Sequence, residues 1–215
     1  VVLLGGPAHG GSPLLMECFP ADKADAALVK GERGGPRETD SEVICRGKLY
    51  REDPEHESGA VVVRSSALFA CMREGGRGVK ITSTRKVSTQ SGTLLASRVH
   101  FQTENIPLLV PDGEGGWRQA APDDHQKYFH TGKQGVAKQK TTVGIWRPGF
   151  VEWRLEFDVV LDLGFDLSIK TYLEVFEKAG RDAGLLSFRP ACNGTYGIFV
   201  GDEFVVQKYV PVAQP

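Results

Sequence analysis

Residues 152–206 contain the clearest periodicity of the chain, and they constrain its fold more than any other stretch. Over Trp153–Leu163, large apolar residues alternate with polar ones, as expected for a half-buried strand. Over Ile169–Ala183, apolar residues recur close to every 3.6 positions, as on one face of a helix. Thr195–Val206 is again extended in character. The stretch predicts a strand, a helix and a strand, and it carries no catalytic motif.

The other apolar runs predict a mainly antiparallel sheet with one further helix. Expected strands are Val1–Leu4, Glu42–Tyr50, Ala60–Val63 and Asn105–Val110, while Val79–Thr84 and Thr93–Val99 are expected to pair as a hairpin. Ser65 or Ser66 is expected to cap a helix over Ala67–Met72. With 215 residues, the chain is long enough for one domain, 1–215. Residues 17–40 and 112–145 are the candidate flexible arms or insertions of this α+β domain.

The net charge of −1 conceals an uneven distribution. Residues 73–147 hold twelve Lys or Arg against six Asp or Glu, whereas the two flanks hold fourteen against twenty-one. A basic middle segment of this kind indicates either a surface for an anionic ligand or a chance cluster on solvated loops.

Within that segment, residues 123–142 form the most unusual stretch of the sequence. After Asp124 no acidic residue occurs until Glu152, and lysines, glycines and aromatic residues are interleaved. Single-stranded nucleic acids are bound by cations that follow the phosphates and by flat side chains on which bases stack. The opposing interpretation is a lysine-rich solvated loop whose aromatic residues anchor it to the core. The stretch predicts a long loop or a protruding hairpin between two core strands.

The candidate phosphate contacts are Lys127, Lys133, Lys138, Lys140 and Arg147, and the candidate stacking groups are Tyr128, Phe129 and Trp146. Arg73, Arg77, Lys80, Arg85 and Lys86 extend this surface if the hairpin expected over 79–99 lies near it.

Other kinds of chemistry have little support in the sequence. No phosphate-binding glycine motif is present, so no nucleotide cofactor is expected. His125 and His130 lie near Asp123 and Asp124, but in a basic segment that opposes a cation, so no metal is expected. A general acid–base pair remains open, because carboxylates such as Glu152 can meet partners only in the fold.

No apolar run is long enough for a membrane span. The four cysteines (18, 45, 71 and 192) lack CxxC spacing, as in a reduced cytosolic protein.

A family resemblance adds to these expectations. The segments that carry it are Arg147-Pro148-x-Phe150-x-x-Trp153-x-Leu155-x-Phe157, Ala179-Gly180-Arg181-x-x-Gly184-Leu185, Phe188-Arg189-Pro190 and Gly197-x-Phe199. They resemble an uncharacterised family of bacteriophage and prophage proteins, densely only after residue 147. The sequence departs from that family at Leu185-Leu186-Ser187, where Gly-Asp is usual, and at Gly197-Ile198, where Gly-Arg is usual. The resemblance implies a cytoplasmic protein of a phage-infected bacterium. It also implies an RRM-like, ferredoxin-type fold similar to the RAMP proteins and their Cas7-like subunits, which bind single strands as repeated copies.

The sequence therefore leads to a principal hypothesis and an alternative. The principal one is a non-catalytic, sequence-tolerant single-stranded DNA- or RNA-binding protein of a phage, multimeric along the strand, acting in replication or recombination. The alternative is a self-assembling structural or interaction protein without affinity for nucleic acid, in which the arms clasp neighbouring copies. An enzyme would require at least three His or carboxylate side chains that converge on one cleft.

Overall fold

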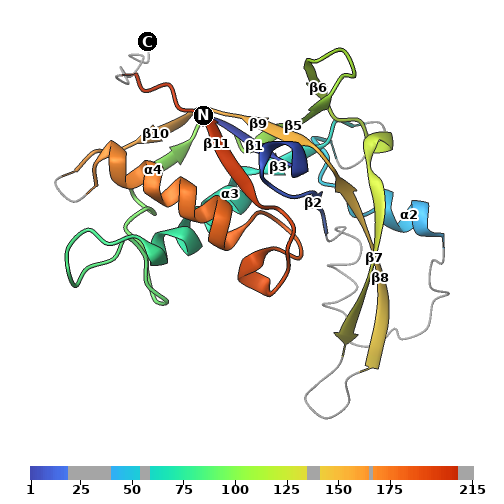
Figure 1. The fold of residues 1–215 in the computed structure, drawn as a ribbon, viewed down its shortest axis with the longest axis horizontal. Coiled ribbons are helices and arrows are strands. Elements are labelled where there is room, and N and C mark those ends of the chain that lie inside the picture. The colour runs from blue at the N-terminus through green and yellow to red at the C-terminus, as the bar shows by residue number, and fades with distance from the viewer. Residues whose placement is uncertain (19–39, 54–58, 135–140, 165–166, 208–215) are drawn as a thin grey trace.

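The computed structural model describes residues 1–18, 40–53, 59–134, 141–164 and 167–207. Its main element is a six-stranded antiparallel sheet, in which five strands follow the order β11-β1-β9-β5-β3 (Figure 1). The sixth strand, β6, pairs with residues 109–111 of β5, whereas β3 pairs with residues 105–107. The strands are β1 (Val2–Gly5), β3 (Val62–Arg64), β5 (Asn105–Pro111), β6 (Trp117–Gln119), β9 (Trp153–Glu156) and β11 (Phe199–Glu203). The chain is thus an α+β protein with a mainly antiparallel sheet, as the sequence predicted.

The two faces of this sheet differ because side chains alternate along each strand. Leu3, Leu155 and Leu108 lie in register across β1, β9 and β5, and all three are fully buried in the hydrophobic core. The next row, on the opposite face, places Leu4 and Leu109 beside Arg154, which is partly exposed. One face therefore forms the core, and the other is mixed in polarity.

Two helices supply the other half of the core. Helix α3 (Ser65–Gly75) buries Leu68 and Met72, and helix α4 (Ile169–Lys178) buries Tyr172 and Phe176. A π-helical turn, η4 (Ala179–Ala183), extends α4 and packs against α3. The Ser168 side chain caps α4 by accepting a hydrogen bond from the Thr171 N–H at 3.2 Å. The strand, helix and strand predicted from residues 152–206 are present, although the first strand is divided into β9 and β10 (Val159–Leu161).

A second sheet projects from this body as a long hairpin (Figure 1). Strand β7 (Gln126–Gln134) pairs with β8 (Thr141–Phe150) over nine residue pairs, and β2 (Leu14–Leu15) joins the base of β8. The short helix α2 (Ser41–Arg46) packs beside β8. Residues 126–134 and 141–150 are therefore a β-hairpin rather than an irregular loop.

Three local predictions were wrong. Residues 42–50 begin as helix α2 rather than as a strand, because the Asp40 carboxylate caps the Glu42 N–H at 2.8 Å and Glu42 pairs with Arg46 one turn later. Neither serine caps α3, whose N-cap residue is Arg64 and has no side-chain capping bond.

The hairpin expected over residues 79–99 is also absent from the described fold. That segment has only the isolated bridges Lys80↔Lys86 and Ser88↔Thr93, while Val79, Val87 and Leu95 are each buried separately in the core. Strand β4 (Val99–Phe101) pairs with β10 instead. The β-branched residues of this segment favour strands, but burial of its separate apolar side chains in the core determines its conformation instead.

Candidate nucleic-acid interface

The outer face of the β7–β8 hairpin presents an aromatic pair. Phe129 and Trp146 are directly opposite each other in the strand register, and their ring centroids are 4.9 Å apart at an angle of 54°. Phe129 is 54% exposed, and Trp146 is partly exposed. Of the three predicted stacking residues, these two are brought together at the surface.

The position of the Phe129 ring depends on a glycine of the neighbouring strand. A Cβ atom at Gly144 would lie 2.7 Å from two carbons of that ring. Phe129 therefore covers Gly144, an arrangement in which an aromatic ring shields the bare backbone of a strand glycine. The exposed ring is held in place on two sides, by Gly144 and by Trp146.

Tyr128 points to the inner face of the hairpin and belongs to a different cluster. Its ring contacts Tyr196 edge-on at 5.7 Å, and Tyr196 in turn contacts His130 at 5.4 Å. His130 stacks on Phe188 with a centroid distance of 4.5 Å and an angle of 21°. Burial, and then the charge of Arg147, lower the pKa of His130. These rings attach the hairpin to the body, so Tyr128 is not placed to stack on a ligand.

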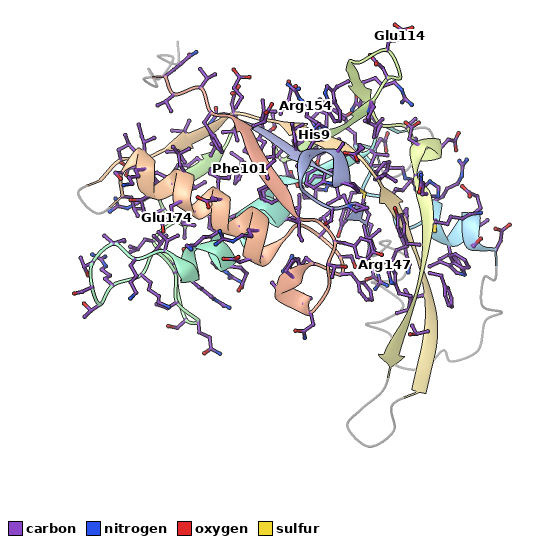
Figure 2. The ribbon with its side chains drawn as sticks, viewed as in Figure 1. His9, Phe101, Glu114, Arg147, Arg154 and Glu174 are labelled. Atoms are coloured by element: carbon purple, nitrogen blue, oxygen red, sulfur yellow. The ribbon has the colours of Figure 1, made fainter. Side chains whose placement is uncertain are left out.

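Arg147, predicted to contact phosphate, is instead 5% exposed. Its Nη2 atom lies 2.5 Å from Oε2 of Glu17, its Nε donates to the Ser187 hydroxyl at 2.9 Å, and its guanidinium lies 4.3 Å above the Phe188 ring. The inner face of β8 places it where the hairpin meets the body (Figure 2). This side chain has a structural role in the described conformation, and its proposed contact with a phosphate does not agree with its burial.

Lys127 lies on the outer face beside Phe129, but it already has an acidic neighbour. Its Nζ atom is 3.4 Å from Oε2 of Glu42, and Nε2 of His125 is 3.5 Å from Oε1 of the same carboxylate. Although its slight burial acts to raise the pKa of Glu42, the hydrogen bonds from Arg46 and Lys127 and the charge of His125 lower it. A phosphate at Lys127 would have to compete with Glu42.

The remaining predicted cations do not join this surface. Arg73 and Arg77 lie at the end of α3, where both approach Glu74. The segment that carries Lys80, Arg85 and Lys86 follows α3, at the opposite end of the molecule from the hairpin (Figure 1). The condition under which these cations would extend the basic surface, a position of residues 79–99 near the β7–β8 hairpin, is therefore not met in the described fold. Lys138 and Lys140 lie outside the described residues, and for Lys133 only the backbone is described.

A pocket that the sequence did not predict lies between the hairpin base and the sheet. It measures about 260 Å³, and its lining residues are Val110, Pro111, Arg118, Asp124, Gln126, Phe150, Val151 and Glu152. Glu152 lies between β8 and β9, and its side chain is 22% exposed. The Ala8 N–H donates to its Oε1 at 3.0 Å, and Nε2 of His9 is 3.9 Å from its Oε2. No local pattern predicts this arrangement, because residues 8–9 and 152 meet only through the pairing of β1 with β9.

No family model, curated protein or solved structure matches this chain. Within the described ranges, no three His, Cys, Asp or Glu side chains gather in a way that would hold a metal ion. No helix in the part of the chain that the structure describes is long and apolar enough to cross a membrane.

Proposed function

We propose that this chain is a non-catalytic, sequence-tolerant single-stranded nucleic-acid-binding protein of a phage, and that the outer face of the β7–β8 hairpin holds the strand. Several copies would bind side by side along one strand during replication or recombination. The observation that carries the proposal is the exposed Phe129–Trp146 pair on a projecting hairpin whose residues, 125–151, include no Asp or Glu. Aromatic rings in a basic setting are the elements that sequence-tolerant binding requires.

The topology of the sheet supports a ferredoxin-like assignment of the kind found in RRM proteins. Strands β1, β5, β9 and β11, with α3 between the first two and α4 between the last two, follow the β-α-β-β-α-β connectivity. Their spatial order, β11-β1-β9-β5, corresponds to 4-1-3-2 with every neighbouring pair antiparallel.

In an RRM, aromatic side chains on the open face of the sheet stack on the bases. In this chain the corresponding face of the two central strands carries Leu4 and Arg154 rather than aromatic rings. The stacking function is therefore assigned to the hairpin, where Phe129 and Trp146 lie. Fold analogy alone would not locate a binding surface.

The phosphate contacts in this proposal are Lys127, Lys133, Lys138 and Lys140. Lys127 exchanges its Glu42 partner for a phosphate, while the three others follow from the sequence alone. Arg147 is removed from the set of contacts because its charge is neutralised by Glu17. Its function is to hold the hairpin against the body.

A fluorescence anisotropy titration with a labelled oligothymidylate tests the proposal. The expected result is binding at low salt that weakens linearly with the logarithm of the salt concentration. Replacing Phe129 by Leu keeps an apolar cover over Gly144 but removes the flat ring, so affinity falls about tenfold, within the roughly 1–3 kcal/mol per stacked base. Phe129→Tyr keeps the ring and is the matched control. Absence of binding at low salt, or equal affinity of the Leu and Tyr variants, would contradict the proposal.

One observation favours the alternative of self-assembly. Val43 on α2 is 52% exposed, and Phe129 on the neighbouring hairpin is 54% exposed, so two large apolar side chains face solvent on adjacent elements. Such side chains also serve contacts between protein copies. Size-exclusion chromatography with light scattering separates the two functions. Nucleic-acid binding predicts larger assemblies only after the oligonucleotide is added, whereas self-assembly predicts them without it.

A further inference from the structure

Two strands of this chain have one side without a strand partner. Among the described residues, β11 pairs only with β1, and β7 pairs only with β8. Neither strand makes a backbone hydrogen bond to a described residue on its other side. Such a row of unpaired N–H and C=O groups is a template on which a further strand can pair.

The open edge of β11 combines an apolar side chain with acidic ones. Its residues from Val200 to Glu203 are exposed, and Val200 is 40% exposed. Val200 pairs with Leu4, and Glu203 pairs with Val2, so a one-residue bulge places Val200 and Glu203 on the same face of the sheet. This edge therefore presents an apolar side chain and, further along the same face, a carboxylate.

The outer face of β7 carries the matching residues. Lys127 and Phe129 lie two positions apart on this face, and both are exposed. Trp146 contacts the Phe129 ring from the side of β8, so the other side of the ring is turned to the open edge. Residues 125–151 contain no Asp or Glu. The open edge of β7 is therefore basic and apolar, whereas that of β11 is acidic and apolar.

We propose that β11 of one copy adds to the open edge of β7 of the next copy as an antiparallel strand, and that this contact orders neighbouring copies on a bound single strand. With Val200 opposite Phe129, the faces of the two strands coincide, and Glu203 comes level with Lys127. Apolar then meets apolar, and acid meets base. A parallel strand in the same position would put Glu203 beside Thr131, which carries no charge.

The partner at each edge is a second copy of this chain. The strands β11 and β7 of one chain belong to different sheets and lie apart, so they do not pair with each other (Figure 1). Two copies of β11 would bring their acids into one ladder, and two copies of β7 would bring their lysines together, so both symmetric pairings are repulsive. Because two different surfaces meet instead, the assembly continues as an open row of copies.

The contact is small, and it leaves the nucleic-acid surface accessible. A contact over five residues buries far less than the roughly 1,000 Å² of a stable interface, so copies in solution stay apart. Copies held on one strand reach an effective concentration on the order of 1 mM, at which a weak contact forms. Lys127 has three N–H donors, so Glu42, Glu203 and a phosphate can share its ammonium group. The inference rests on the proposed function, which supplies the strand that brings the copies together.

Anisotropy titrations of the intact protein with two oligothymidylates test this contact. One oligonucleotide has about 8 nucleotides and holds one copy, whereas the other has about 40 and holds several. Binding per copy is expected to be about tenfold tighter on the long oligonucleotide. Glu203→Lys should reduce this ratio to about one. Glu177→Lys makes the same charge change at an exposed acid of α4, so it should bind the short oligonucleotide as Glu203→Lys does but keep the ratio.

Cross-linking tests the position of the contact without nucleic acid. A Val200→Cys variant and a Thr131→Cys variant, each also carrying Cys192→Ser, are mixed at about 1 mM and treated with a short bis-maleimide. Thr131 is exposed on the outer face of β7, diagonal to the expected position of Val200 and about 7–8 Å from it. Mass spectrometry should find a link between residues 200 and 131 of different chains. Glu177→Cys in place of Thr131→Cys should give no link to residue 200.

The outcomes separate this contact from the proposed function. Equal affinity per copy on both oligonucleotides, or an equal effect of Glu203→Lys and Glu177→Lys on the ratio, rejects the contact and leaves the proposed function intact. If neither oligonucleotide binds, the proposed function fails, and the cross-link alone decides: a link between 200 and 131 supports the contact, and its absence rejects it. Cooperative binding without that link, or links mainly between two copies of residue 200, would also overturn the proposal.

Discussion

Glu17 and Arg147 are 130 residues apart in the sequence, and their side chains form an ion pair with an Oε2–Nη2 distance of 2.5 Å. The pair joins the segment after β2 to the base of the hairpin. Nζ of Lys48 lies 3.6 Å from the other carboxylate oxygen, so one acid serves two cations. The junction between the hairpin and the body therefore depends on the charge of Glu17.

Glu17→Gln is expected to lower the free energy of unfolding by about 1–3 kcal/mol. The effect is smaller than the roughly 3–5 kcal/mol for a fully buried pair, because Glu17 is 30% exposed, but it leaves the buried Arg147 without a counter-charge. Urea unfolding measures it. Glu104→Gln removes an acid that pairs with Arg64 but is 81% exposed, and it should change the free energy by less than about 1 kcal/mol. Equal effects of the two substitutions would refute the structural role of the pair.

Removal of Glu42 should strengthen binding to a single strand. Glu42→Gln releases Lys127 from its ion pair, so oligothymidylate affinity at low salt should rise a few-fold. Conversely, Lys127→Ala should reduce the slope of log affinity against log salt by about 0.7, the value for one phosphate contact on a single strand. Glu177→Gln on α4, far from the hairpin, provides the charge-matched control. If both Glu→Gln variants raise affinity equally, only net charge is involved.

Gly6→Ala should destabilise the fold more than Gly10→Ala. Both glycines have positive φ, but a Cβ at Gly6 would overlap Glu152 and the Val151 carbonyl, whereas nothing lies within 4 Å at Gly10. The expected costs are about 3 kcal/mol or more at Gly6 and about 1–2 kcal/mol at Gly10. Thermal unfolding compares the two variants. A milder effect at Gly6 would mean that the loop moves away from Glu152 easily.

Stability should fall as the solution is acidified below pH 6.5 because of His130. Burial and the charge of Arg147 hold the pKa of His130 below its ordinary value of 6.5 in the folded state. Between the folded and unfolded pKa values the unfolded chain binds more protons, so stability rises with pH through this window and is lost as the pH falls. Urea midpoints measured at neutral pH and in this acidic window should differ less for His130→Asn than for the wild type. An unchanged difference would assign the acid sensitivity to other groups.

Thiol labelling should distinguish the cysteines by burial. Cys192 is exposed, whereas burial raises the pKa of Cys45 to about 11 and that of Cys71 to about 12. Because the thiolate is the reactive form, maleimide should modify Cys192 rapidly and Cys71 only after unfolding. Mass spectrometry of labelled peptides, with and without denaturant, gives the rates. Rapid native labelling of Cys71 would contradict its burial on α3, where its Sγ contacts the Ala179 carbonyl of η4.

The elements that the sequence predicted are those whose signals are local. Helices α3 and α4 and strands β1, β5 and β11 have clear apolar periods and defined ends, and each was located within a few residues. Helix α2 was missed because Val43 and Ile44 are β-branched, and its cap, Asp40, lies at the end of a long polar stretch. A capping side chain such as Asp40 can start a helix where the residue propensities favour a strand, and the propensities alone do not include this effect.

The sequence predicted the residue types of the candidate site, but it did not predict which of these side chains lie on the outer face of the hairpin. The alternation along β7 separates Phe129, which faces outward, from Tyr128, which packs on Tyr196, and this separation requires the hairpin register. Arg147 looked like a surface cation because the acid that neutralises it lies 130 residues away. Glu152 became a pocket residue through the pairing of β1 with β9. Contacts of such long sequence separation leave no trace in a local pattern.

The central position of β1 has a consequence for synthesis of the chain. Gly5 pairs with Trp153 on one side and with Phe199 on the other, so β1 lacks its first partner in this sheet until β9 has been translated and its second until β11 has. At about 5–20 residues per second, Phe199 is added roughly 10–40 s after Gly5, from which it is separated by 194 positions. Both edges of β1 are open to other strands until β9 emerges, and one edge stays open until β11 emerges, so nascent chains on one messenger are exposed to mutual pairing. Covering the open edge of β1 during synthesis is therefore expected to raise the yield of folded protein without changing the stability of the finished sheet.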